Sequence, residues 1–362
     1  MTSTRLQVGD TLQLTVTARS DDGLRMTLQC EAAAAATVLP PSPTLPALRP
    51  GPSGAQGVQR LLDHVRPLGA IRMAVVHPCD ALSLRGALDA QAAGLIEPVL
   101  IAPRAKLEAA LQAAGLQPDD LAGIEVIDVP HSHAAAARGA ELAAQGRVEA
   151  LMKGSLHTDE LMAAVVPAAS GLRTKRRISH CFLMQTPAYP RPFIITDAAI
   201  NIAPTLADKA DIVQNAIALA HAIGVPQPRV ALLAAVETVN AAMPATLDAA
   251  ALCKMADRGQ ITGGLLDGPL AFDNAVSMEA AQVKGIVSQV AGRADVLVVP
   301  DLESGNMLAK QLEYLGDASS AGIVLGPRVP IVLTSRADSR ESRIASCALA
   351  SLLAHAYRRA PP

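Results

Sequence analysis

The stretch "VPIVLTSRADSRESRIAS", residues 329–346, shows in miniature how the chain is built. An apolar run, "IVL", stops before Thr334, and Ser335, Arg336 and Asp338 follow almost at once. A short apolar run that ends in polar residues, before a run that mixes charged and small residues, indicates a buried strand followed by a helix. The same stretch places a hydroxyl, a guanidinium and a carboxylate where that strand ends, so it is also a candidate site.

This alternation extends over most of the chain. From about residue 70, β-branched runs such as "IRMAVVHP", "PFIITD", "RVALLAAV" and "ADVLVVPD" alternate with Ala/Leu-rich stretches such as "ADIVQNAIALAHAIGV". Alternating strands and helices predict an α/β fold in which helices cover both faces of mostly parallel sheets. The number of strands favours two sheets with a cleft between them. We expect one domain from residues 58–175 plus 323–362 and a second from residues 176–322.

The N-terminal part has a different pattern. Residues 1–38 contain "LQVGDTLQLTVTARSDDGLRMTLQC", which reads as two alternating strands joined at Asp21-Asp22-Gly23, a hairpin turn signal. Residues 39–57 are rich in Pro, Gly and Ser, a composition typical of a linker.

Composition excludes several classes of function. Half of the 362 residues are apolar and 18% are charged, so the chain is globular. A net charge of -2 and 2% aromatic residues argue against a nucleic-acid partner. No apolar run approaches the ~20 residues of a membrane span, and "MTSTRLQVGD" has no apolar segment of the kind found in signal peptides. The five cysteines form no C-x-x-C pair, which suits reduced thiols in a cytoplasm, and neither they nor the histidines show metal-ligand spacing.

Polar residues follow several of the expected strands directly. Ligands of parallel α/β sheets bind at the carboxyl ends of the strands, and helix N-termini bind anions. These residues are Lys153, Gly154 and Ser155; Asp197; Asp301 with Ser304, Gly305 and Asn306; and Ser335 with Arg336. Each is singly an ordinary helix cap, but four strand ends of the same kind indicate anion sites.

A basic run, "RTKRR", occupies residues 173–177. It is either a solvated face or a place for the phosphates of a large anion, with Arg177 among its members. The P-loop pattern G-x-x-x-x-G-K-[ST] is absent from the sequence, so a P-loop nucleotidase is excluded.

Several long segments resemble the phosphate acetyl/butyryltransferase family. They are "MKGSLHTDELM", "ISHCFLMQTPAYPRPFIITDAAINIAPTLADKADIVQNA", "DGPLAFDNAVS", "SQVAGRADVLVVPDLESGNMLAK" and "GPRVPIVLTSRADS". The resemblance runs from about Ala70 to the C-terminus and is closer to the butyryl-type branch. It implies a two-domain fold like that of isocitrate and isopropylmalate dehydrogenases. It also implies a cytoplasmic homodimer that moves an acyl group between coenzyme A and inorganic phosphate in a ternary complex, without a metal or other cofactor.

Residues 1–38 are similar to the last strands of the hot-dog domain of an enoyl-CoA hydratase, which precedes the acyltransferase in some bacterial chains. The helix and the catalytic Asp/His of a hydratase are missing, so the resemblance implies a remnant without hydratase activity.

The resemblance also implies roles for single residues. Ser335 and Arg336 match a Ser-Arg pair that orients the acyl phosphate and stabilises its charge. Gly305 and Asn306 match a Gly-Asn motif near the bound substrate, and Lys310 matches a family lysine.

Two positions depart from the acetyl-type pattern. Ser342 stands where those members have an aspartate that deprotonates the CoA thiol, an acid that the butyryl-type branch also lacks. Asp338, Glu341 or Asp301 can replace it, or the thiol ionises in solution because its pKa is about 8.5. Tyr314 stands where a family arginine is found, so Arg177 and Lys153 are the candidates for anion contacts.

Three other readings stay open on the sequence alone. The acyl chain length is not readable, so a phosphate butyryltransferase is an alternative to the acetyltransferase. A related metal-dependent dehydrogenase needs several carboxylates across the cleft, and the acids Asp197 and Asp301 are too few to make that case. A binding protein without catalysis is the third, because of Ser342.

Overall fold

The structure is a computed structural model that describes residues 14–19, 26–30, 54–334 and 338–362. Contacts between residues divide the chain into two compact units, Met1–Arg49 and Pro50–Pro362. In the first unit, β1 (Leu14–Arg19) pairs antiparallel with β2 (Met26–Cys30), which confirms the hairpin. The expected turn at Asp21-Asp22-Gly23 and residues 39–53 of the expected linker lie outside the described residues. Residues 54–57 were also expected in the linker, but they begin helix α1.

The second unit alternates strands and helices. Its strands are β3 (Ile71–Val76), β4 (Ile96–Ala102), β5 (Glu125–Asp128), β6 (Ala150–Lys153), β7 (Ser179–Gln185), β8 (Phe193–Thr196), β9 (Arg229–Leu233), β10 (Leu265–Leu270), β11 (Val296–Val298), β12 (Ser319–Leu325) and β13 (Ile331–Val332). Its α-helices are α1 (Gly54–Val65), α2 (Ala81–Ala92), α3 (Arg104–Ala113), α4 (Ser132–Ala144), α5 (Thr158–Val165), α6 (Leu206–Ala222), α7 (Pro244–Asp257), α8 (Phe272–Val276), α9 (Met278–Val283), α10 (Leu302–Leu315) and α11 (Arg340–Arg359). Three single 3₁₀ turns are η1 (Arg66–Leu68), η2 (Pro118–Leu121) and η3 (Ala168–Ser170).

The strands form one eleven-stranded sheet in the order β10-β9-β11-β8-β7-β12-β13-β6-β3-β4-β5. The two outer groups, β10-β9-β11-β8 and β13-β6-β3-β4-β5, are parallel within themselves. β7 and β12 lie between them and pair antiparallel with each other and with their neighbours β8 and β13. The α/β class is therefore confirmed, but the expectation of two separate sheets is wrong, because the strands form one continuous sheet. The domain boundaries expected near residues 175 and 322 stay a prediction.

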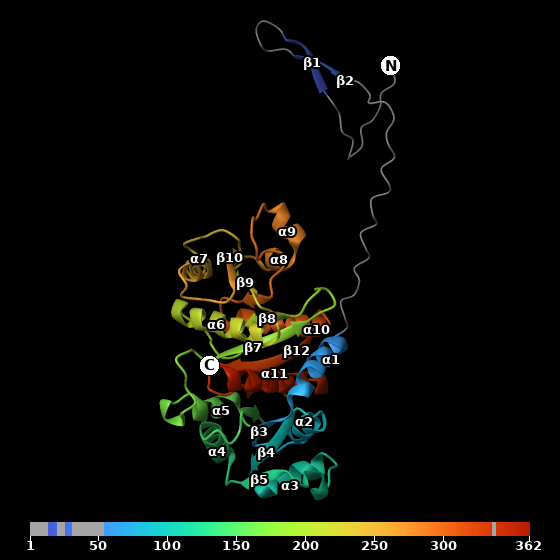
Figure 1. Cartoon of the computed structure of the whole chain (residues 1–362), viewed down its shortest axis with the longest axis vertical. Helices are drawn as coiled ribbons and strands as arrows, with labels where there is room; N and C mark the ends of the chain where they lie inside the picture. Colours follow the sequence, from blue (N-terminus) through green and yellow to red (C-terminus); the bar gives the residue numbers. More distant parts are fainter. Residues whose placement is uncertain (1–13, 20–25, 31–53, 335–337) are drawn as a thin grey trace. The chain divides into compact units, whose positions relative to one another are not determined.

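The helices cover the two faces differently (Figure 1). On one face a single continuous core runs under both parallel groups, with α11, drawn in red, at its middle. The segment "ASCALASLLA" of α11 is buried throughout because its small side chains let the helix lie close to the sheet. On the other face the core is divided into two clusters, one under α4 and α5 and one under α8, α9 and α10.

Several pairs of neighbouring strands send their chains to opposite faces of the sheet, among them β3 with β6 and β8 with β11. β3 leads to α2 on the continuous core and β6 leads to α5 on the divided side. Likewise β8 leads to α6 on the continuous core and β11 to α10 on the divided side. Such switch points open a crevice at the carboxyl ends of the two strands, where ligands bind in α/β proteins. The residues that follow these four strands are therefore candidates for the site: 77–80, 154–157, 197–201 and 299–306.

His180 makes the stability of the sheet depend on pH. It lies fully buried on β7, with its ring edge-to-face against Phe182 at 4.4 Å. Burial, helped by the charge of Lys310, lowers the pKa of His180 from 6.5 to about 3. In the unfolded chain His180 binds a proton as the pH falls below 6.5, whereas in the folded chain it stays neutral until about pH 3. We therefore expect the stability present above pH 6.5 to be lost as the pH falls toward 3, by at most about 1.4 kcal/mol per pH unit from this residue.

Urea unfolding at pH 7 and pH 5 measures this slope. His180→Leu removes the titrating group, so the difference in unfolding free energy between the two pH values should shrink relative to wild type. An unchanged difference would contradict the assignment to His180.

Candidate functional site

The first switch point brings the loops after β3 and β6 into direct contact. The N–H of Gly154 donates to the carbonyl oxygen of Val76 at 2.8 Å. A Cβ at position 154 would lie 2.4 Å from the carbonyl oxygen of His77, which no side chain allows. Glycine is therefore required where the two strand ends meet.

Ser155 and His77 join the same loops. The N–H of Ser155 donates to the carbonyl oxygen of His77 at 2.9 Å, and the Ser155 hydroxyl donates to the same oxygen at 3.0 Å. That hydroxyl accepts from the N–H of Cys79 and lies 3.2 Å from Nδ1 of His77. Ser155 was expected to contact substrate, but its hydroxyl is engaged within the protein.

His77 is a residue of this crevice that sequence reasoning missed. It is buried, adopts φ 58° in the left-handed region, and its Nε2 has no hydrogen-bond partner among the described residues. Burial, with the charge of Lys106, lowers the pKa of His77. Its position directly after the run "IRMAVV" was the available signal, because the other strand ends were chosen by the same rule.

Lys153 and Thr334 bring the end of β13 to this switch point. Nζ of Lys153 donates to the carbonyl oxygens of Gly154 at 3.3 Å and Leu156 at 3.2 Å. The hydroxyl of Thr334 donates to the carbonyl oxygen of Lys153 at 3.3 Å. The residues that follow Thr334, Ser335 and Arg336, lie outside the described residues.

The second switch point is organised by Asp197. Its buried carboxylate accepts from the N–H groups of Ala199 at 2.9 Å, Ile200 at 3.0 Å and Asn201 at 3.2 Å, and from Nδ2 of Asn201 at 2.5 Å. Burial raises the pKa of Asp197, and these hydrogen bonds oppose the rise. The carboxylate thus fixes the shape of the loop 197–201.

The N-terminus of α10 rests on that loop. A Cβ at Gly305 would lie 2.7 Å from the carbonyl oxygen of Asp197, and Nδ2 of Asn306 donates to the carbonyl oxygen of Ala198 at 3.2 Å. Asp301 caps α10 by accepting from the N–H of Ser304 at 2.8 Å and from its hydroxyl at 2.7 Å. Asp301 and Ser304 therefore have structural partners, whereas Gly305 and Asn306 join the helix to the loop.

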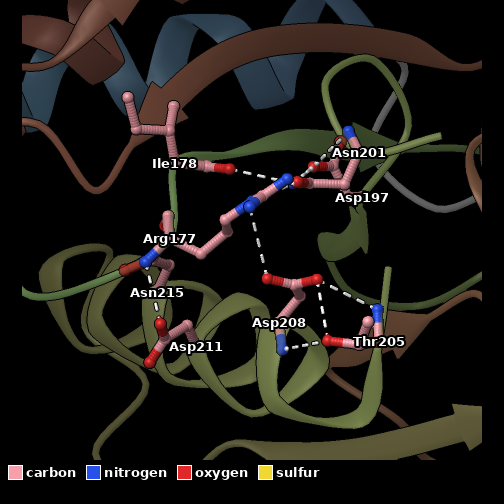
Figure 2. A network of polar contacts seen from close by, with 8 residues as sticks. All are labelled: Arg177, Ile178, Asp197, Asn201, Thr205, Asp208, Asp211 and Asn215. Atoms are coloured by element: carbon pink, nitrogen blue, oxygen red, sulfur yellow. Dashed lines mark hydrogen bonds and ion pairs between the residues drawn. The ribbon is translucent and has the colours of Figure 1, made fainter. Parts of the chain in front are cut away.

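Arg177 links this loop to α6, as Figure 2 shows. Its Nε donates to Oδ1 of Asn201 at 2.8 Å, and its Nη1 lies 3.4 Å from Oδ1 of Asp208. The backbone N–H of Arg177 donates to Asp211 at 2.8 Å, and its carbonyl oxygen accepts from Asn215 at 2.9 Å. The side chain of Arg177 is thus held pointing toward Asn201.

A cavity of about 400 Å³ opens beside this network. It is bounded by Val166, which follows α5, and by residues at the start of α6. Its lining residues are Val166, Arg173, Lys175, Arg176, Arg177, Ile178, Ile200, Asn201, Ala207, Asp208 and Asp211. Four cations thus face two carboxylates, which makes the cavity suitable for a ligand with several negative charges.

Two observations connect the strand ends. Ile200, after β8, and Leu333, after β13, pack against the same hydrophobic cluster. The pKa of Lys310 is raised overall. Burial alone would lower it, but the hydrogen bond to Glu313 and the charges of Glu313 and Asp338 outweigh burial. The charge of Asp338 therefore contributes to the electrostatic environment of Lys310 on α10.

The two residues that depart from the acetyl-type pattern, Ser342 and Tyr314, both lie in described helices. Ser342 is half-buried in the first turn of α11, where its N–H donates to the hydroxyl of the N-cap residue Ser339 at 3.0 Å. Tyr314 is exposed on α10. The structure therefore offers no acid at position 342.

Within the described ranges, no group of three or more His, Cys, Asp or Glu side chains is arranged to hold a metal ion. None of the helices in those ranges is both long and apolar enough to cross a bilayer.

The chain is similar to known acyltransferases over most of its length. Residues 130–351 match the family model "Phosphate acetyl/butaryl transferase". The chain is 59% identical to a phosphate acetyltransferase of Rhizobium meliloti, over 85% of this chain and 96% of the relative. It is 40% identical to a phosphate butyryltransferase of Clostridium acetobutylicum, over 78% and 93%.

A solved structure agrees with these relatives. The crystal structure of a branched-chain phosphotransacylase from Enterococcus faecalis V583 superposes with a TM-score of 0.70 at 30% identity, over 79% of this chain and 99% of that chain. The chain therefore belongs to the phosphate acetyl/butyryltransferase family.

Proposed function

We propose that this protein is a phosphate acetyltransferase, which catalyses acetyl-CoA + phosphate = acetyl phosphate + CoA. The basic cavity beside the loop 197–201 carries this proposal on the structural side, because both substrates are phosphate-bearing anions. The 59% identity to a phosphate acetyltransferase supports the acetyl group. The dehydrogenase alternative is set aside, because the family is one of acyltransferases.

The reaction needs positioning more than it needs a cofactor. A phosphate oxygen attacks the thioester carbonyl, the C–O bond forms, and the C–S bond breaks with the electron pair leaving on sulfur. Holding both substrates in one complex supplies several kcal/mol through effective molarity. Donors aimed at the carbonyl oxygen stabilise the oxyanion that forms there. By the family resemblance we assign this role to Ser335 and Arg336.

The proton on the CoA thiol needs an acceptor in the reverse direction. Asp301 is occupied by the cap of α10, and Glu341 is exposed on the first turn of α11. We assign the role to Asp338, which follows the Ser-Arg pair and is close enough to Lys310 to raise its pKa.

We assign the phosphates of coenzyme A to the cavity lined by residues 173–177. Arg173 is exposed and Arg176 half-buried, and neither makes an ion pair within the described residues, so their charges are available to a ligand. A charge-assisted hydrogen bond contributes roughly 1.5–3 kcal/mol. Arg173→Ala with Arg176→Ala should therefore raise KM for acetyl-CoA about tenfold or more, with kcat little changed.

A truncated substrate tests this assignment. Acetyl-pantetheine carries the thioester but no phosphate, so the double variant and wild type should use it equally well. Lys254→Ala, an exposed lysine paired with Asp257, is the matched control and should behave as wild type with both substrates. An equal loss with acetyl-CoA and acetyl-pantetheine would place the phosphates elsewhere.

A phosphate butyryltransferase is the second candidate, supported by the 40% identity to such an enzyme. Trapping the acyl phosphate product with hydroxylamine distinguishes the two. We expect kcat/KM to be higher for acetyl-CoA than for butyryl-CoA, and the opposite order would reassign the enzyme. Failure of both thioesters to give a hydroxamate would favour the non-catalytic binding protein.

We also propose that the enzyme is a cytoplasmic homodimer. Four cysteines are free thiols, as expected in a reducing compartment: Cys79, Cys181, Cys253 and Cys347. Exposed apolar side chains on and beside α9 and α10 support a subunit contact there: Val283, Val287, Met307, Tyr314 and Leu315. Light scattering on the purified protein tests the dimer, and a monomer mass at micromolar concentration would overturn it.

A further inference from the structure

Arg343 carries a buried charge that the described structure does not neutralise. It lies in the first turn of α11 and is 8% exposed. Its Nη1 donates to the backbone carbonyl oxygen of Asp338 at 2.6 Å. Among the described residues, its Nε has no hydrogen-bond partner and no carboxylate forms an ion pair with it. Burial of an unpaired guanidinium destabilises a fold, so stability alone does not explain this residue.

Helix α2 makes room for the same side chain. A Cβ at Gly86 would lie 3.3 Å from Cδ and 3.6 Å from Nε of Arg343, and 3.4 Å from Cε of Met152. A glycine within a helix lowers helix stability relative to alanine. Gly86 and Arg343 each lower the stability of the folded chain, and the two residues contact each other.

Arg343, placed by this contact with Gly86, holds the backbone of Asp338 through its hydrogen bond. A hydrogen bond from a charged donor is among the stronger ones, and here it holds the backbone of a residue that precedes α11. Asp338 is the assigned proton acceptor. Its carboxylate must be held at the reacting centre, because a misplacement of about 1 Å lowers rates by up to about 100-fold.

We propose that Arg343 is a positioning residue for acyl transfer, which acts through Asp338 and depends on Gly86 for its place. This inference rests on the proposed function and adds to it a residue at a position where the sequence gives no functional signal. Arg343 does not touch the substrate; it fixes the segment that carries the proton acceptor.

Gly86→Ala separates a catalytic effect from a structural one. Alanine favours the helix, so Tm should stay the same or rise, whereas the new methyl group displaces Arg343 by a few tenths of an ångström. We expect kcat to fall about fivefold or more, with KM for acetyl-CoA within twofold of wild type. Full activity in a folded Gly86→Ala protein would overturn the proposal.

Variants of the arginine itself complete the test. Arg343→Met should lower kcat about 10- to 100-fold at unchanged KM, and Arg343→Lys should recover part of the loss because its ammonium group still donates. Arg340→Met is the matched control, because Arg340 lies in the same turn but is exposed and pairs with Asp89 at 2.6 Å. Its kcat should equal that of wild type. A loss in Arg343→Met that only follows the unfolded fraction, without rescue by lysine, would contradict a positioning role.

A double-mutant cycle tests the route through Asp338. In an Asp338→Asn background, Gly86→Ala should lower kcat by less than about twofold, because the group that it displaces no longer acts. Losses that multiply would show that Arg343 does not act through Asp338. Wild-type protein without phosphate-dependent release of CoA would instead refute the proposed function itself, so the two failures are distinguishable.

Discussion

Gly154→Ala should abolish acyl transfer and lower the stability of the protein by about 3 kcal/mol or more. The added Cβ would lie 2.4 Å from the carbonyl oxygen of His77 and 2.6 Å from that of Val76. Both are backbone atoms of the neighbouring strand end, so no rotamer change relieves the clash. The loops after β3 and β6 must then separate, which opens the first switch point.

Thermal unfolding and CoA release measure this together. Ser155→Ala is the companion variant, since it removes hydroxyl contacts at the same place but leaves the backbone approach intact. It should cost about 1 kcal/mol and less than tenfold in rate. A Gly154→Ala protein with wild-type Tm and activity would show that the two loops need not meet.

Gly305→Ala should lower kcat about 100-fold with a much smaller loss of stability. The new Cβ would lie 2.7 Å from the carbonyl oxygen of Asp197 and 2.8 Å from Cγ2 of Val299. The start of α10 must move away from the loop 197–201, and Asn306 moves with it. Helix propensity favours alanine by roughly 1 kcal/mol, which offsets part of the strain. The family resemblance places Asn306 near the substrate, and a misplacement of about 1 Å there has an effect of this size on the rate.

Steady-state kinetics and urea unfolding check this prediction. Gln311→Ala is the matched control, because Gln311 lies further along α10 and its polar side chain is exposed. It should leave kcat unchanged. If Gly305→Ala kept full activity while its stability fell, the contact between α10 and the loop would be structural only.

The fold class was predictable because strands and helices have recognisable local sequence patterns. Runs such as "PFIITD" and "RVALLAAV" are β8 and β9, and the Ala/Leu-rich stretch between them is α6. The joining of the two parallel groups was not predictable. The predicted strands do not include β7 and β12, and an apolar run does not reveal whether its partner runs parallel or antiparallel.

Candidate site residues were predictable where they follow strand ends, and not where they depend on packing between segments remote in sequence. Ligands bind at the carboxyl ends of parallel strands, and this rule led to Gly154 and Gly305. Both lie at switch points where the Cβ of any other residue would clash with neighbouring backbone atoms. The sequence does not decide whether the basic run 173–177 is a solvated face or a phosphate site, and in the structure the run lines a cavity. Arg343 gave no signal, because its burial depends on Gly86, which is remote in sequence.

The measurement that tests the central claim most directly is release of CoA from acetyl-CoA, followed with a thiol reagent, with and without phosphate. It compares wild type with Arg336→Ala. We expect release that requires phosphate in wild type and falls at least about 100-fold in Arg336→Ala, because a donor to the developing oxyanion is lost. Absence of phosphate-dependent release from acetyl-CoA and from butyryl-CoA in the wild-type protein would contradict an acyltransferase.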